Sequence, residues 1–174
     1  MRRISLAEAH HILSEHQERG HHVDSRLWEQ LDRGQLFLVT LMDQDAFLSL
    51  VWQCIDGVRL LAPEGKSRTL RDVATRMRVR SLTFEALSGD LGKNRTTHNP
   101  CWFQKCEPID REFDFKKFGT VAITPTTDGE RRDSPLGSFY IYDGCHKSLV
   151  LAEKLLSSKV PYHPVQAILL LPRR

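Results

Sequence analysis

Several features are scarce in this 174-residue chain, and each scarcity excludes a class of protein. The four cysteines, at positions 54, 101, 106 and 145, are too few for the disulfide scaffold of a small secreted domain. No apolar run approaches the roughly 18 residues that a membrane-spanning helix requires. The first residues carry two arginines but lack the apolar segment of a signal peptide. We therefore expect a globular cytoplasmic protein with free thiols and no membrane span.

An excess of charge of one sign is also lacking. The chain has 25 Lys and Arg residues against 22 Asp and Glu residues, a formal net charge of +3. This mild excess does not establish nucleic-acid binding, so the distribution of the basic residues matters more than their sum. Hydrophobic residues make up 40% of the chain, which is enough for one good core or for one domain with an extension.

The first 95 residues predict helices followed by antiparallel strands. Ser5 and Glu8 have the spacing of a capping box, which starts a helix that ends near Gly20. A short second helix begins near Ser25 and ends before Gly34. The following patterns predict strands at 35–41, 46–55 and 58–62, the last two joined by an Asp-Gly hairpin turn.

A further helix is predicted from Thr69 to about Arg80, and a loop rich in Gly, Asn and Thr follows at 88–100. We place a domain boundary near residue 95, which gives an N-terminal region of residues 1–95 and a C-terminal domain of residues 96–174. The C-terminal part predicts strands at 116–125, 138–142 and 165–171, with a polar loop at 126–137 and a helix at 147–156. The fold class predicted for the whole chain is α+β.

The joint between the strand at 138–142 and the next helix carries the most informative residues, Asp143, Gly144, Cys145, His146 and Lys147. The first N–H groups of a helix lack partners within the helix, and the helix dipole adds partial positive charge there. A glycine lets the backbone approach a ligand closely, which favours an anion site.

Asp143 would repel a bare phosphate, so it indicates a magnesium ion or an oriented nucleophile beside the phosphate. The alternative is that Asp143 only caps the helix and that His146 and Lys147 are solvated.

Residues 138–170 resemble the signature of the ParB/sulfiredoxin superfamily. Sulfiredoxins have a Gly-Gly-Cys-His-Arg turn between a strand and a helix, and serine-kinase relatives have an Asp-Gly-His-His-Arg turn. Val165 and Ala167 match the strand that follows. With its unmatched N-terminal half, the chain is similar to the plasmid fertility-inhibition subgroup, whose members block the export of a competing conjugative element.

The resemblance implies a ParB/sulfiredoxin-like α/β domain that binds ATP and hydrolyses it, with Mg²⁺ as the accompanying ion. It assigns the nucleotide to Gly144, Cys145, His146, Lys147 and Ser148, with Asp143 as metal ligand and Asp143 and His146 as catalytic residues. Lys147 replaces the usual arginine, so a bidentate phosphate contact is lost although the charge stays.

Upstream residues complete the expected site. Glu107, or alternatively Asp110, is expected to face Asp143 as a second carboxylate, and Glu107 is the third expected catalytic residue. The loop with Glu130, Arg131 and Arg132 could close over the nucleotide.

Basic residues also gather in the helix at 69–80. If its buried side is Leu70, Val73, Ala74 and Met77, four arginines are left for nucleic-acid phosphates: Arg71, Arg76, Arg78 and Arg80. The alternative is an ordinary solvated helix face.

These observations predict an ATP-hydrolysing plasmid fertility-inhibition protein that acts on or binds DNA, with nuclease activity as a further option. Its expected partners are a nucleotide, DNA and a component of conjugation or type IV secretion. The rival functions are a small-molecule kinase, a sulfiredoxin-like reductase that uses Cys145, and a non-enzymatic blocker of a secretion partner.

Overall fold

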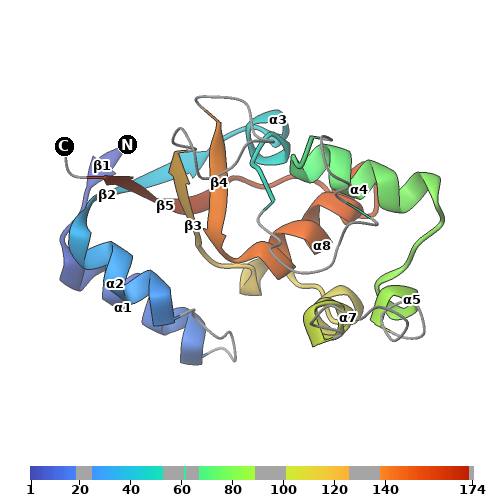
Figure 1. The fold of residues 1–174 in the computed structure, drawn as a ribbon, viewed down its shortest axis with the longest axis horizontal. Helices are drawn as coiled ribbons and strands as arrows, with labels where there is room; N and C mark the ends of the chain where they lie inside the picture. Colours follow the sequence, from blue (N-terminus) through green and yellow to red (C-terminus); the bar gives the residue numbers. More distant parts are fainter. Residues whose placement is uncertain (19–24, 53–60, 62–66, 89–100, 126–137, 173–174) are drawn as a thin grey trace.

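The computed structural model describes residues 1–18, 25–52, 61, 67–88, 101–125 and 138–172. Helices and a mixed five-stranded sheet form an α+β fold, as the sequence predicts (Figure 1). The strands are β1 (Arg2–Arg3), β2 (Gly34–Leu41), β3 (Val121–Pro125), β4 (Phe139–Asp143) and β5 (Val165–Pro172), in the order β1-β2-β5-β3-β4.

The strand nearest the C-terminus lies at the centre of this sheet. β5 pairs antiparallel with β2 over its whole length and parallel with β3, while β3 pairs antiparallel with β4. A central strand is covered on both faces, which suits the nearly continuous apolar run of β5.

The domain boundary expected near residue 95 lies outside the described residues. Strands from both sides of it nevertheless share the sheet, because β2 precedes the boundary and pairs with β5 along Gly34–Leu41. The N-terminal strands therefore extend the same sheet that carries β3 and β4.

Helices cover both faces of the sheet. On one face, α1 (Leu6–Glu18) and α2 (Ser25–Arg33) pack on a cluster that includes Leu36, Ala122 and Ile168. The other face carries α3 (Gln44–Leu48), α4 (Leu70–Val79), α5 (Phe84–Ser88), α7 (Cys101–Arg111) and α8 (Cys145–Leu156) (Figure 1). Alternation along β5 separates the two clusters, since Ile168 belongs to the first and Ala167 and Leu169 to the second.

Two helix starts predicted from the sequence are confirmed, while the helix predicted from residue 147 starts earlier, at Cys145. Ser5 N–H donates to the Glu8 carboxylate (2.8 Å) and Glu8 N–H donates to Ser5 Oγ (3.1 Å), which is the predicted capping box of α1. Thr69 Oγ1 accepts from Asp72 N–H at 3.2 Å and caps α4.

The strand predicted at 46–55 is wrong over its described part. Asp43, which lies between two of the predicted strands, caps α3 by accepting from Ala46 N–H at 2.7 Å. Val51 keeps only isolated bridges to Thr69 and Tyr140. The hairpin at 56–57 lies outside the described residues, as does the strand at 58–62 except for Leu61, which lies in a turn.

Two helices near the expected loop were not predicted. α5 starts at Phe84, and α7 contains Pro108, a residue that normally argues against a helix interior. Phe103 and Cys106 are buried and Ile109 packs against the same core. The strand predicted at 116–125 is shorter than expected, because Phe115–Lys117 form a 3₁₀ turn capped by Asp114 and β3 starts at Val121.

Candidate functional site: the turn between β4 and α8

The strand–glycine–helix joint predicted from the sequence is present. β4 ends at Asp143, Gly144 takes a left-handed conformation (φ 90°, ψ 16°), and α8 starts at Cys145. A Cβ at Gly144 would lie 2.9 Å from Lys147 Cε and 3.0 Å from Val121 Cγ1. Both the backbone conformation and the close packing therefore require glycine.

The N-terminal end of α8 is suited to an anion. α8 is 12 residues long, and its N-cap makes no side-chain cap hydrogen bond because Gly144 has no side chain. The helix dipole places partial positive charge at this end. A ligand can thus approach backbone here with no capping side chain in the way.

Asp143 lies beside this helix end. Its side chain is half-buried at the last position of β4, opposite Ala122 of β3. The charge of Asp143 favours the protonated form of Lys147. The predicted neighbourhood of an acid, a glycine and a lysine is therefore present.

Lys147, however, does not point toward solvent. Its residue exposure is 6%, and its ammonium donates to the carbonyl oxygens of Phe118 and Thr120, both at 2.8 Å. Burial lowers the pKa of Lys147 to about 8, an effect that the charge of Asp143 opposes. The interpretation of Lys147 as a solvated residue is wrong, and its expected phosphate contact has to compete with two carbonyl contacts.

His146 is largely buried between α8 and α7. Burial lowers its pKa to about 4, and the charge of Lys105 acts in the same direction. The imidazole is therefore neutral at pH 7 and adds no positive charge to the turn. The interpretation of His146 as a solvated residue of the first turn is wrong for the same reason.

Cys145 and Ser148 differ in access. Cys145 is half-buried, and its thiol donates to the carbonyl of Ile141 at 3.4 Å. Ser148 is fully buried, and among the described residues its Oγ has no hydrogen-bond partner. The expected contact between Ser148 and a nucleotide is wrong for this conformation, because no ligand in solvent can reach the hydroxyl.

The two carboxylates of α7 that were expected near Asp143 pair with other residues. Glu107 accepts from Ser88 Oγ at 3.0 Å and pairs with Arg111 at 2.6 Å. Asp110 pairs with Lys154 at 2.8 Å, near the opposite end of α8 from Asp143. These contacts direct both carboxylates to α5 and to the C-terminal half of α8. The second carboxylate expected beside Asp143 is thus engaged with other partners.

A magnesium ion finds only part of its ligands in the protein. Within the described part of the chain, no group of three or more His, Cys, Asp or Glu residues could hold a metal ion. Magnesium is often bound by one carboxylate together with substrate phosphates. Asp143 fits that mode, provided that a nucleotide supplies the other oxygens. The loop residues Glu130, Arg131 and Arg132 lie outside the described residues.

The arginines of α4 contact the protein itself. Arg71 pairs with Asp45. Arg76 is half-buried, and its guanidinium donates to the carbonyls of Leu61 (2.9 Å) and Ser67 (2.9 Å). The premise that Arg76 lies on an exposed, unengaged helix face is therefore wrong.

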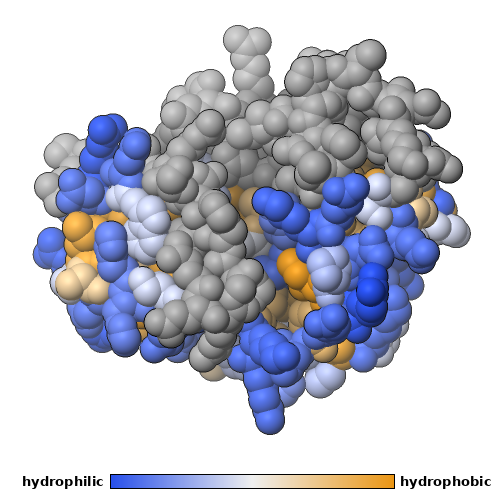
Figure 2. All heavy atoms as spheres, turned by 90° about the horizontal axis from the view of Figure 1, so that it is seen from below, coloured by the Kyte–Doolittle hydropathy of each residue, from blue (hydrophilic) through white to orange (hydrophobic). Residues whose placement is uncertain are grey.

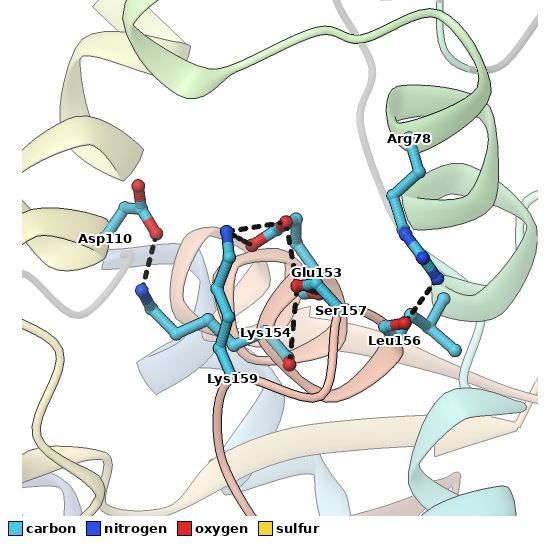
Figure 3. Close-up of polar contacts among 7 residues, drawn as sticks. All are labelled: Arg78, Asp110, Glu153, Lys154, Leu156, Ser157 and Lys159. Carbon is cyan, nitrogen blue, oxygen red and sulfur yellow. Dashed lines mark hydrogen bonds and ion pairs between the residues drawn. The ribbon is translucent and has the colours of Figure 1, made fainter.

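Arg78 reaches across to α8. Its guanidinium donates to the carbonyl of Leu156, at the C-terminal end of α8 (Figure 3). Figure 3 also shows the Lys154–Asp110 pair, so α4 and α7 both hold this end of the helix. Arg80 is exposed and is the C-cap residue of α4. As predicted, Leu70, Val73, Ala74 and Met77 form the buried side of α4.

Sequence reasoning missed the carbonyl groups of Phe118 and Thr120. Backbone oxygens carry no sequence signal of their own. The only hint is Gly119 between them, which has a left-handed φ of 67° and turns the chain so that both carbonyls face one ammonium.

Two surface observations complete the description. None of the helices in the described ranges is both long and apolar enough to cross a membrane. Figure 2 shows hydrophilic residues over most of the coloured surface of one face, with hydrophobic residues in smaller areas between them.

Comparison of the chain with protein-family models, with curated proteins and with solved structures gave no match, so the resemblance described above rests on the residues of this turn and its flanking elements.

Proposed function

We propose that the protein binds ATP at the turn formed by Asp143, Gly144, Cys145 and His146, and that it hydrolyses the bound nucleotide. The observation that carries the proposal is the left-handed Gly144 at the start of α8. The N-cap offers no side chain to the first N–H groups of this 12-residue helix, whose positive end is a favourable position for a phosphate group. Lys147 has no phosphate contact in this proposal, because its ammonium binds Phe118 and Thr120.

Asp143 has the central chemical role. Phosphoryl transfer depends mainly on positioning and on charge neutralisation, so a single carboxylate beside the phosphate can be decisive. Asp143 would hold Mg²⁺ together with oxygens of the nucleotide, and the bound ion would neutralise negative charge on the phosphates. Asp143 would also orient a water molecule toward the terminal phosphate. His146 contributes an uncharged ring, since its pKa is about 4.

The experiment measures ATP binding by calorimetry and phosphate release by a colorimetric assay. Asp143→Asn should still bind ATP but release little phosphate. Gly144→Ala should weaken ATP binding, because a Cβ at this left-handed position meets Lys147 and Val121 and displaces the first turn of α8. The exposed Glu112 gives a matched control, and Glu112→Gln should behave as wild type.

Two results would contradict the proposal. One is the absence of ATP binding to the wild-type protein at millimolar nucleotide. The other is wild-type phosphate release by Asp143→Asn. Circular dichroism of each variant separates a local effect from loss of the fold.

A second function is favoured by the burial of Lys147 and the neutrality of His146. The first keeps the Lys147 ammonium away from a bound phosphate, and the second leaves His146 without a positive charge. A non-enzymatic blocker of a secretion partner would bind nucleotide without releasing phosphate. The two assays distinguish this function from ATP hydrolysis.

The biological role proposed with the site is inhibition of conjugative transfer, supported by the resemblance of residues 138–170. Cells that produce the protein should transfer a conjugative element less often than cells without it. Asp143→Asn should restore transfer if hydrolysis is needed. Inhibition that is unchanged in this variant would instead favour the blocker.

A further inference from the structure

The ammonium of Lys147 occupies a defined binding site. Two backbone carbonyl oxygens, those of Phe118 and Thr120, each lie 2.8 Å from Nζ. The ring of Phe118 adds a third attractive group, with its centroid 5.2 Å from Nζ. Carbonyl oxygens and an aromatic face are the groups that bind small monovalent cations in proteins.

The surroundings hold this site in place. Phe118 and Thr120 are each 4% exposed. The ring of Phe118 stacks on Phe115 at 5.7 Å and contacts Phe47 edge-on at 6.2 Å. Gly119 between the two carbonyls has a φ of 67°, which lets both oxygens face the same point. The surrounding packing and the backbone conformation of Gly119 thus fix the orientation of both carbonyls.

The site also links two elements that meet at the proposed nucleotide turn. Phe118 and Thr120 precede β3, while Lys147 lies in the first turn of α8. The stem of Lys147 packs on Gly144, since an added Cβ there would lie 2.9 Å from Lys147 Cε. The position of the first turn of α8 therefore depends on where this ammonium is held.

We propose that the turn of Phe118, Gly119 and Thr120 is a monovalent-cation site that the chain fills with its own Lys147 ammonium, and that Lys147 thereby positions the first turn of α8 instead of binding phosphate. This inference rests on the proposed function only in naming ATP as the ligand of the turn. The cation site itself is a property of the protein without nucleotide.

The test is chemical rescue. Lys147→Ala keeps Cβ, so n-propylammonium supplies the missing carbons and nitrogen. We expect the variant to unfold at a lower temperature than wild type. Saturating n-propylammonium should raise its unfolding temperature by about 2–4 °C or more, as expected for a ligand that binds only the folded chain. Wild type should not respond, because its own ammonium fills the site.

Two matched additives control the rescue. 1-Propanol has the shape but no charge, and tetramethylammonium has the charge but no N–H donor. Neither should stabilise Lys147→Ala as n-propylammonium does. Equal stabilisation by n-propylammonium and tetramethylammonium, or no stabilisation by n-propylammonium, would overturn the proposed site.

A second variant keeps the test decisive if Lys147→Ala does not fold. Lys147→Met retains most of the stem and loses the donors. Hydrogen exchange should become faster at the amides of 118–122 and 144–148 and stay unchanged in α1. Wild-type exchange at those amides in Lys147→Met would overturn the positioning role.

A nucleotide experiment separates positioning from phosphate contact. If Lys147 only positions the turn, Lys147→Met should bind ATP more weakly but with the wild-type dependence of affinity on salt. A reduced salt dependence would show that the ammonium contacts phosphate, which overturns the positioning role. If wild type binds no ATP, the proposed function fails, while rescue and hydrogen exchange still decide on the cation site.

Discussion

Burial lowers the pKa of His146 more than the charge of the nearby Lys105 does. An exposed imidazole titrates near pH 6.5, but burial and the nearby Lys105 lower the pKa of His146 to about 4. The folded protein therefore resists protonation of this ring over the range in which the unfolded chain accepts it. Between those two pH values, the unfolded state binds more protons than the folded state.

This difference predicts that protonation of His146 lowers the stability of the folded protein in acid. Stability is unaffected by this group above pH 6.5 and falls as the pH drops toward 4, because protonation then favours the unfolded chain. The lowering of the His146 pKa from 6.5 to about 4 corresponds to roughly 3 kcal/mol of stability when it is fully lost. Urea denaturation at pH 7 and pH 4 should show that His146→Gln loses less stability than wild type. Equal losses in both proteins would show that other groups account for the acid sensitivity.

The residues of the turn show how far sequence reasoning reaches. The role of Gly144 could be predicted, because it depends on adjacent residues: this glycine joins a strand directly to a helix. Lys147 could not be placed correctly, because its direction depends on carbonyl groups 27 and 29 residues away. Ser148 was expected to be accessible, because the sequence of one helical turn does not reveal which face of the helix is buried.

At the scale of elements, α4 shows why a cluster of arginines need not be a nucleic-acid surface. Its apolar stripe was predictable from the spacing of Leu70, Val73, Ala74 and Met77, and its start from Thr69. The partners of the arginines were not predictable, because they are carbonyls at Leu61, Ser67 and Leu156. The helix uses these side chains to bind neighbouring segments.

Arg76 gives a prediction that distinguishes the two roles. Arg76→Gln should lower the free energy of unfolding by about 1–3 kcal/mol, because the part-buried bond to the Leu61 carbonyl and the exposed bond to the Ser67 carbonyl lose their charged donor. Binding to a labelled oligonucleotide should keep its wild-type salt dependence. Thr75→Gln, at an exposed position of the same helix, serves as the control and should change stability by less than about 0.5 kcal/mol. A flatter salt dependence in Arg76→Gln would restore the nucleic-acid interpretation.

The errors in element prediction also have physical causes. The apolar run at 46–55 fits a buried strand and a buried irregular segment equally well. Asp43 decides between them by capping α3. Pro108 argued against a helix at 101–111, yet α7 forms because Phe103 and Cys106 pack into the core. A local cap thus decides the first case, while tertiary packing overrides local preference in the second.

At the scale of the whole molecule, β5 unites both faces of the sheet. Ile168 is fully buried on the side of α1 and α2, while Ala167 is fully buried on the side of α8. Ile168→Ala should lower the free energy of unfolding by about 2–4 kcal/mol through lost burial and a cavity. Gln166→Ala, at an exposed position of the same strand, should change it by less than about 0.5 kcal/mol.

Calorimetry of the same two variants tests the domain division. If the two faces of the sheet form one cooperative unit, Ile168→Ala should shift a single unfolding transition. Two separate transitions, with only one of them shifted, would support independent regions at 1–95 and 96–174.

The central place of β5 also affects how the chain can be made. During synthesis, β2 leaves the ribosome long before β5. In the folded protein the two strands are paired, with Leu41 opposite Val165. During that interval, the edge of β2 that β5 will cover is open, and its apolar side chains lack their final neighbours. We therefore expect the nascent chain to be prone to aggregation until β5 has left the exit tunnel, because only then can β2 pair with it.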